Sequence, residues 1–207
     1  GLTLTTTAPA PELKITSELK TATESDGYTY SYVDFGTVEY GQTAAITVSF
    51  EGKNLPAKYT YWDYETDPNG VEVEKDNYVT FHLSTMPFFD VELSEGGKVE
   101  VVEGWGGMSM TSYTFPIAAD GTAKGTVTMT LKKDFGADPF DEVAGYGLPA
   151  GESVAVGSVA FGDQTSENNT DYVTVMLTLT KPAQGGDGTA LEDATVEANK
   201  AVKVLEN

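Results

Sequence analysis

The chain has 207 residues and a formal net charge of −20, from 32 acidic and 12 basic side chains. All 12 basic residues are lysines, so no guanidinium group is present for bidentate recognition of phosphate. Nucleic-acid phosphates and anionic lipid both repel such an acidic chain. No apolar run approaches the roughly 20 residues that a membrane-spanning helix needs, and there is no cysteine for a disulfide. We therefore expect neither nucleic-acid binding nor membrane insertion.

The first 27 residues, beginning "GLTLTTTAPAPELK", are rich in threonine and interrupted by proline. This composition indicates an extended N-terminal arm or linker at 1–27. The β-forming run "LTLTTT" adds an alternative, in which the arm pairs with a sheet edge of its own domain or of a partner.

From Tyr28 to Pro182 the chain consists of short segments in which apolar and polar residues alternate. Such alternation places one face of a strand on a core and the other in water. The apolar positions are Ala44, Ile46, Val48 and Phe50; Tyr113, Phe115 and Ile117; Val127, Met129 and Leu131; and Val173, Val175, Leu177 and Leu179. The pattern predicts an all-β domain at 28–182, most simply an antiparallel β-sandwich.

Turn-forming sequences separate these segments: "EGKN" at 51–54, "DPNG" at 67–70, "SEGG" at 94–97 and "ADG" at 119–121. Between them we expect further strands at 57–63, 71–83, 88–93, 98–102 and 153–161. "QGGDG" at 184–188 indicates that a Gly-rich linker and C-terminal tail occupy 183–207. The tail fits a helix and a strand equally well.

The segment "DFGTVEYGQTAAITVSFEGKNL" at 34–55 resembles the first two strands of bacterial Ig-like modules of the choice-of-anchor or abundant-in-Bacteroidetes kind. The resemblance continues through "FDV" at 89–91, "YTFPIAADGTAKGTVTMTL" at 113–131 and "YVTVMLTLTKP" at 172–182. It implies an Ig-like sandwich with two long insertions, at 56–85 and 132–165. Sandwiches of this kind host many activities, so the resemblance implies no ligand.

The tail "ATVEANKAVKVLEN" at 194–207 is similar to the opening of C-terminal secretion-signal tails on Bacteroidetes surface proteins. Together the two resemblances imply a secreted or cell-surface protein, associated with the outer membrane.

Residues suited to catalysis are sparse. His82 is the single histidine, and no serine lies in a nucleophile elbow. Asp138 with Asp141 or Glu142 could form a two-carboxylate pair, but close acidic pairs arise by chance in so acidic a chain. We therefore expect no enzymatic activity.

A calcium loop is the most specific cofactor hypothesis. "ETDPNGVEVEKD" places Glu65, Asp67, Asn69 and Asp76 at positions 1, 3, 5 and 12 of an EF-hand-like register. "DPNG" is also a strong turn in its own right, so a solvated hairpin turn without a cofactor is the preferred interpretation.

Aromatic residues offer a binding hypothesis. In "KYTYWDY" Tyr59 and Tyr61 share one strand face, and Trp62 and Tyr64 take the other. Trp105 lies between glycines in "EGWGGM". If these aromatic side chains are exposed, a stacking surface for sugar rings or for a protein would consist of Trp62, Tyr64 and Trp105. Burial beneath an insertion is the expected alternative, because tryptophan is usually well buried.

These patterns predict a non-catalytic structural or adhesive module of an exported bacterial surface protein, with a protein or glycan partner at the cell surface. The alternative is a glycan-binding module that uses its exposed aromatic residues. A third interpretation is an accessory domain of a secreted enzyme.

Overall fold

The computed structural model describes residues 1–3 and 7–183, and in this part of the chain it is all-β, as predicted, with no α-helix. The strands are β1 (Glu12–Ile15), β2 (Lys20–Thr23), β3 (Thr29–Glu39), β4 (Ala45–Lys53), β5 (Lys58–Asp63), β6 (Val71–Asp76), β7 (Tyr78–Thr85), β8 (Phe89–Leu93), β9 (Lys98–Glu103), β10 (Ser109–Pro116), β11 (Ala123–Leu131), β12 (Ser153–Asp163) and β13 (Val173–Thr180). A single 3-10 turn, η1 (Trp105–Gly107), joins β9 to β10. Residues 184–207 of the predicted tail lie outside the described part of the chain.

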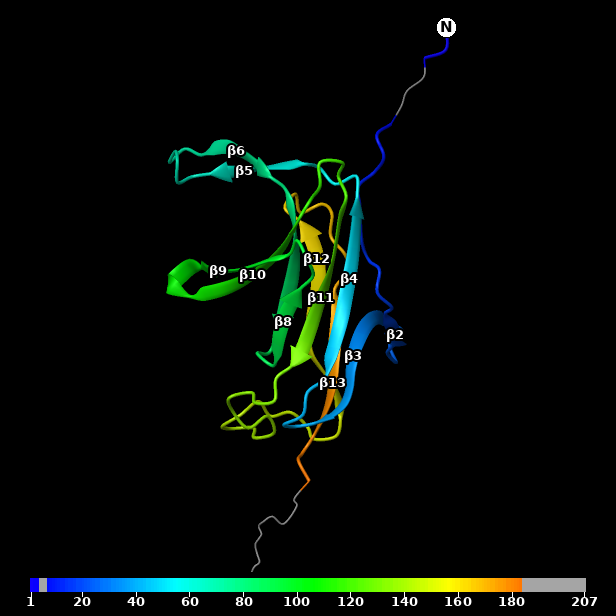
Figure 1. Cartoon of the computed structure of the whole chain (residues 1–207), viewed down its shortest axis with the longest axis vertical. Coiled ribbons are helices and arrows are strands. Elements are labelled where there is room, and N and C mark those ends of the chain that lie inside the picture. Colours follow the sequence, from blue (N-terminus) through cyan, green and yellow to red (C-terminus); the bar gives the residue numbers. More distant parts are fainter. Residues whose placement is uncertain (4–6, 184–207) are drawn as a thin grey trace, which may run out of the picture.

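The strands form two sheets of unequal width (Figure 1). A four-stranded sheet has the order β1-β4-β11-β8, and a seven-stranded sheet has the order β2-β3-β13-β12-β7-β10-β9. A separate hairpin consists of β5 and β6. The sandwich was expected to be antiparallel throughout, but β3 and β13 pair in parallel, so the larger sheet is mixed. The arrangement is consistent with a β-sandwich.

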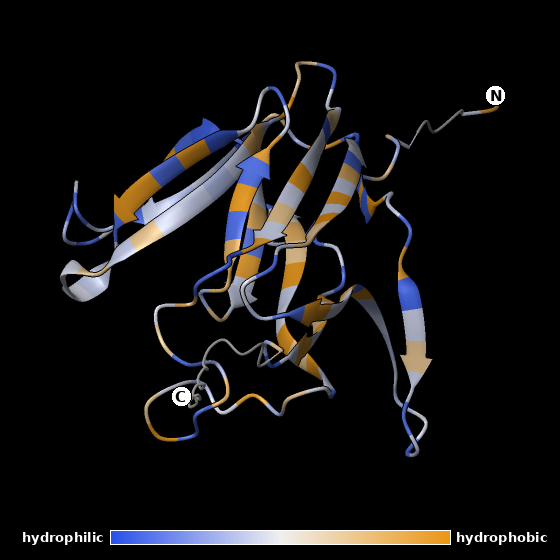
Figure 2. Ribbon diagram, turned by 60° about the horizontal axis from the view of Figure 1, so that its bottom comes forward, coloured by the Kyte–Doolittle hydropathy of each residue, from blue (hydrophilic) through white to orange (hydrophobic). Residues whose placement is uncertain are grey.

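The predicted inward faces of β4, β11 and β13 are confirmed. Val127, Met129 and Leu131 of β11 are at most 1% exposed, and the polar residues between them are only partly buried. The same alternation of apolar and polar side chains is visible along the strands in Figure 2. The two faces meet at Phe50, whose ring centroid lies 5.0 Å from that of Phe115 and 4.6 Å from that of Phe161.

The N-terminal segment contributes one edge strand to each sheet. β1 pairs with β4 in the smaller sheet, and β2 pairs with β3 in the larger one. The segment predicted as an arm at 1–27 therefore pairs with sheet edges of its own domain over 12–15 and 20–23. The run "LTLTTT" lies partly outside the described residues.

The prediction of a single strand at 71–83 is wrong, because Asn77 interrupts the strand and separates β6 from β7. β7 and β12, both assigned to insertions, are central strands of the larger sheet. Of the two segments assigned to insertions, the β5–β6 hairpin and the loop at 132–152 lie outside the two large sheets.

The loop at 132–152 closes one end of the core. Phe135 stacks on Phe88 with ring centroids 4.1 Å apart, and Tyr146 meets the same ring edge-on at 4.8 Å. The Phe135 amide donates to the hydroxyl of Tyr40. This long segment is therefore part of the scaffold.

Truncation of Phe50 tests the aromatic core. Phe50 is 1% exposed, so Phe50→Ala should lower the free energy of unfolding by about 3–5 kcal/mol, through lost burial and an unfilled cavity. Urea denaturation measures this. Tyr28→Ala, at a residue 61% exposed, is the control and should change stability by about 0.5 kcal/mol or less. An equal loss in both variants would contradict the assigned core.

Candidate functional site: two projecting hairpins

Two hairpins extend from the body on the same side of the molecule, in the views of Figures 1 and 2. One is β5–β6, and the other is the outer part of β9–β10. Between them they carry all three aromatic residues that the sequence proposed for binding. Trp62 is 55% exposed, Tyr64 is 63% exposed and Trp105 is 97% exposed.

The indole of Trp62 lies against the backbone of Gly70. A Cβ built on Gly70 would come within 1.6 Å of the indole Nε1, and Gly70 has a φ of +86°, a conformation that glycine adopts without strain. Tyr64 approaches Trp62 edge-on, with ring centroids 6.5 Å apart. The turn therefore holds the indole in place and leaves the rest of its surface open.

The opposite face of the β5–β6 hairpin faces the body. Tyr59 stacks on Tyr61, with centroids 6.0 Å apart, and meets Tyr78 edge-on at 6.3 Å. Burial raises the pKa of Tyr78, and Tyr59 and Glu100 raise it further. Tyr78 thus lies between the roots of the two hairpins, because it contacts Tyr59 of β5 and pairs with Pro116 of β10.

The outward face of β9 and β10 forms a surface groove of about 530 Å³ beside Tyr78. Its lining includes Glu100 and Val102 of β9 and Thr114 of β10. The register explains this set, since Glu100 pairs with Ser112 and Val102 with Met110, so these side chains share one face.

The tip of β9–β10 is apolar and uncharged. No charged residue occurs from 104 to 119. Met108 and Met110 are 70% and 59% exposed beside the almost fully exposed Trp105. Gly106 and Gly107 have φ values of +77° and +78°, so η1 depends on glycine to turn the chain.

The expected burial of Trp62 and Trp105 is wrong. Neither segment that was predicted as an insertion covers Trp105, because the 132–152 loop packs on Phe88 at the core. The β5–β6 hairpin forms a sheet of its own and leaves Trp62 on its surface. Trp105 is accompanied by the exposed Met108 and Met110, and contiguous exposed apolar patches are candidate interaction surfaces.

The four proposed calcium ligands do not gather at one point. Asp67 and Asn69 form the turn, where the Asn69 amide donates to the Asp67 carboxylate and the Gly70 amide to the Asp67 carbonyl. Asp76 lies at the far end of β6, five residues beyond Val71, or about 17 Å along the strand. The "DPNG" segment forms the hairpin turn between β5 and β6, as predicted.

Asp76 instead closes the base of the hairpin with Lys58. The Lys58 ammonium donates to the Asp76 carboxylate, and this hydrogen bond, followed by charge attraction, lowers the pKa of Asp76 and raises that of Lys58. Glu65 lies in the turn, where its amide donates to Asp63.

A buried polar network anchors the root of the β5–β6 hairpin, and no sequence pattern pointed to it. Asn77 is 4% exposed, and its amide nitrogen donates to the Pro56 carbonyl and to Asp163. Its oxygen accepts from the backbone amides of Tyr78 and Gln164. Asparagine followed by a strand of alternating residues is the only local signal, and it is weak.

Two of the carboxylates considered for catalysis accept hydrogen bonds from nearby backbone amides. Asp141 accepts hydrogen bonds from the backbone amides of Ala144 and Val143, and these bonds lower the pKa of its carboxyl. Asp138 accepts a hydrogen bond from the backbone amide of Phe140. Both carboxylates thus shape the 132–152 loop. His82 is exposed on β7.

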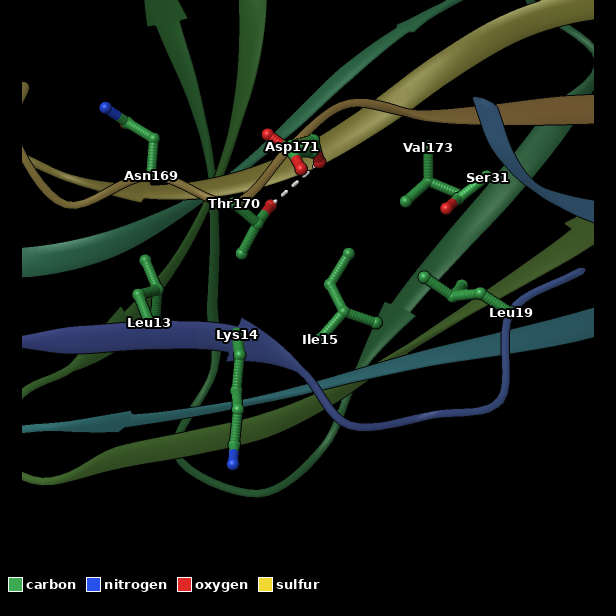
Figure 3. A pocket seen from close by; sticks show the side chains of 9 residues that line it. All are labelled: Leu13, Lys14, Ile15, Leu19, Ser31, Asn169, Thr170, Asp171 and Val173. Carbon is green, nitrogen blue, oxygen red and sulfur yellow. Dashed lines mark hydrogen bonds between the residues drawn. The ribbon is translucent and has the colours of Figure 1, made fainter. Parts of the chain in front are cut away.

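Another cavity, of about 300 Å³, lies where the N-terminal segment crosses between the sheets (Figure 3). Leu13, Ile15 and Leu19 line one side, opposite Val173, and Lys14 points away from them. Thr170 donates to the Asp171 carbonyl at its rim. Mixed aliphatic and backbone groups of this kind fit a packing seam between β1 and the body.

No protein-family model matches the chain, and no curated protein matches it either. The Ig-like resemblance therefore stays a prediction. Within 1–3 and 7–183, no helix has the length and apolar character to cross a membrane. In the same ranges no group of three or more histidine, cysteine, aspartate or glutamate residues is arranged to hold a metal.

Removal of the Asn77 side chain tests the anchor. Asn77→Ala leaves the Pro56 carbonyl, two backbone amides and Asp163 short of a partner, so we expect a loss of about 2 kcal/mol in unfolding free energy. Hydrogen exchange should also accelerate across 58–76. Asn69→Ala, in the exposed turn of the same hairpin, is the matched control, and equal effects would contradict the anchor.

Proposed function

We propose that this chain is a non-catalytic adhesive module of an exported bacterial surface protein, and that it contacts its partner through the β5–β6 and β9–β10 hairpins. The observation that carries the proposal is the exposure of Trp62, Tyr64 and Trp105 on two hairpins that project to the same side. Tryptophan and tyrosine are enriched among the few residues that carry most of the binding energy at protein interfaces.

Preorganisation of Trp62 supports this proposal. Its indole rests on Gly70, and the hairpin beneath it is tied to the body through Asn77. A side chain that is already held in place loses little conformational entropy on binding. The arrangement is therefore suited to recognition rather than to filling space.

The charge of the chain restricts the partner. A net charge of −20 without arginine favours a neutral or cationic partner over an anionic one. The resemblances of 34–55 and of 194–207 support an Ig-like module on an exported protein at the cell surface.

A glycan-binding module is the second candidate, favoured by the chemistry around Trp62. Glu72 lies directly opposite Trp62 in the register, and Thr60 shares the same strand face. An aromatic face for the C–H groups of a sugar, beside acceptors for its hydroxyls, is a combination that neutral glycans can use. An accessory domain of a secreted enzyme would use the same surface.

Iodide quenching and ligand binding test the proposal together. Both tryptophans should be quenched, and Trp105→Ala should remove the more accessible fraction. A ligand found on an array of neutral glycans, or a captured protein partner, should bind Trp62→Ala and Trp105→Ala about tenfold more weakly.

Tyr172→Ala is the matched control, because Tyr172 is 64% exposed outside both hairpins. Fluorescence protected from iodide, or wild-type affinity in both tryptophan variants, would refute the proposal. Binding to neutral glycans would select the second candidate over a protein partner.

A further inference from the structure

The seven-stranded sheet ends in a strand whose outer edge is unpaired in the part of the chain that the structure describes. β9 is the last strand in the order and pairs on one side only, with β10. All six of its residues are exposed. Its outer edge presents a row of backbone N–H and C=O groups about 20 Å long, a template for another strand.

The other edge strands of the two large sheets are shorter. β1 and β2 have four residues each, and β8 has five, with Asp90 and Glu92 on its outward face. Short length is one of the usual ways of blocking edge pairing. β9 has six residues and contains neither a proline nor a bulge in its pairing with β10.

One face of β9 is apolar and becomes progressively less covered toward the tip. On the core-facing side, Phe115 is 1% exposed and Tyr113 is partly buried against Phe81. Val99, paired with Tyr113, is 52% exposed, and Val101 is 73% exposed. An added strand with apolar residues at alternate positions would bury both valines laterally.

The charges around β9 specify what kind of strand fits. The acidic residues of β9 and of the turn before it are Glu95, Glu100 and Glu103. Lys98 is the single cation of β9, and it is already paired with Glu100 at 3.1 Å. The acidic surroundings therefore favour a cationic strand over a second copy of this acidic chain.

We propose that β9 is an acceptor edge for an extended segment of a partner protein whose residues alternate between apolar and lysine or arginine. The backbone of that segment extends the seven-stranded sheet, its apolar side chains lie beside Val99 and Val101, and its cations face Glu100. The contact uses the backbone edge of β9 rather than the exposed tryptophans, so it goes beyond the aromatic contacts of the proposed function.

The test uses the full chain and the capped peptide KVKVTVKVK. At low salt, hydrogen-exchange mass spectrometry should show new protection of about three amides within 98–103, since alternate residues of an edge strand point outward. The acidic peptide EVEVTVEVE should give none. A peptide methylated at alternate backbone nitrogens should lose the effect as well.

Glu100→Lys should weaken binding of the cationic peptide about fivefold, because the attraction between residue 100 and the peptide's cations becomes a repulsion. Glu12→Lys changes the net charge equally on the exposed β1 and should bind as the wild type. Equal protection by both peptides, protection outside 98–103, or no protection would overturn the proposal. Self-association of the free chain through β9 would overturn it too, since the partner would then be acidic.

Iodide quenching and ligand binding report on Trp62 and Trp105, whereas hydrogen exchange reports on the backbone amides of β9. Loss of glycan or protein binding at Trp62 and Trp105 leaves the β9 result unaffected. The proposed function and the acceptor edge can therefore fail separately.

Discussion

The unequal width of the two sheets determines most of what is distinctive in this molecule. Apolar side chains remain dry only where one sheet lies over the other, and four strands cannot cover seven. Side chains are buried along β13, β12 and the inner end of β10, but none is buried on β9. The exposed tip, the free edge and the groove beside Tyr78 all lie beyond the limit of this overlap.

The sequence was informative wherever structure depends on neighbouring residues. Alternation along β4, β11 and β13 identified their buried faces, because a pleated strand presents successive side chains to opposite sides. The break at Asn77 depends on Asp163, which lies 86 residues away in the chain, so no local pattern reveals it. The exposure of Trp105 likewise depends on whether another layer covers it. Glycine neighbours alone do not determine that.

Many of the acidic residues support turns. Asp63, Asp120 and Asp141 accept hydrogen bonds from groups two or three residues onward, and these bonds lower the pKa of each carboxyl. A carboxyl with a lowered pKa in the folded state adds stability above its unfolded pKa, and this stability is lost as the pH falls through the folded value. Part of the negative charge is therefore tied to loop geometry, at 63–66, 120–122 and 141–144.

The parallel pairing of β3 with β13 has a mechanical consequence. The register runs from Thr174 opposite Tyr32 to Thr180 opposite Glu39, so the two strands point the same way. Tension that enters at the start of β3 and leaves at the end of β13 pulls the strands past each other along their length. The evenly spaced, slanted hydrogen bonds of this parallel pair then share the load and must break together rather than one at a time. A module anchored at one end and attached to a partner at the other would resist extension through this pair of strands.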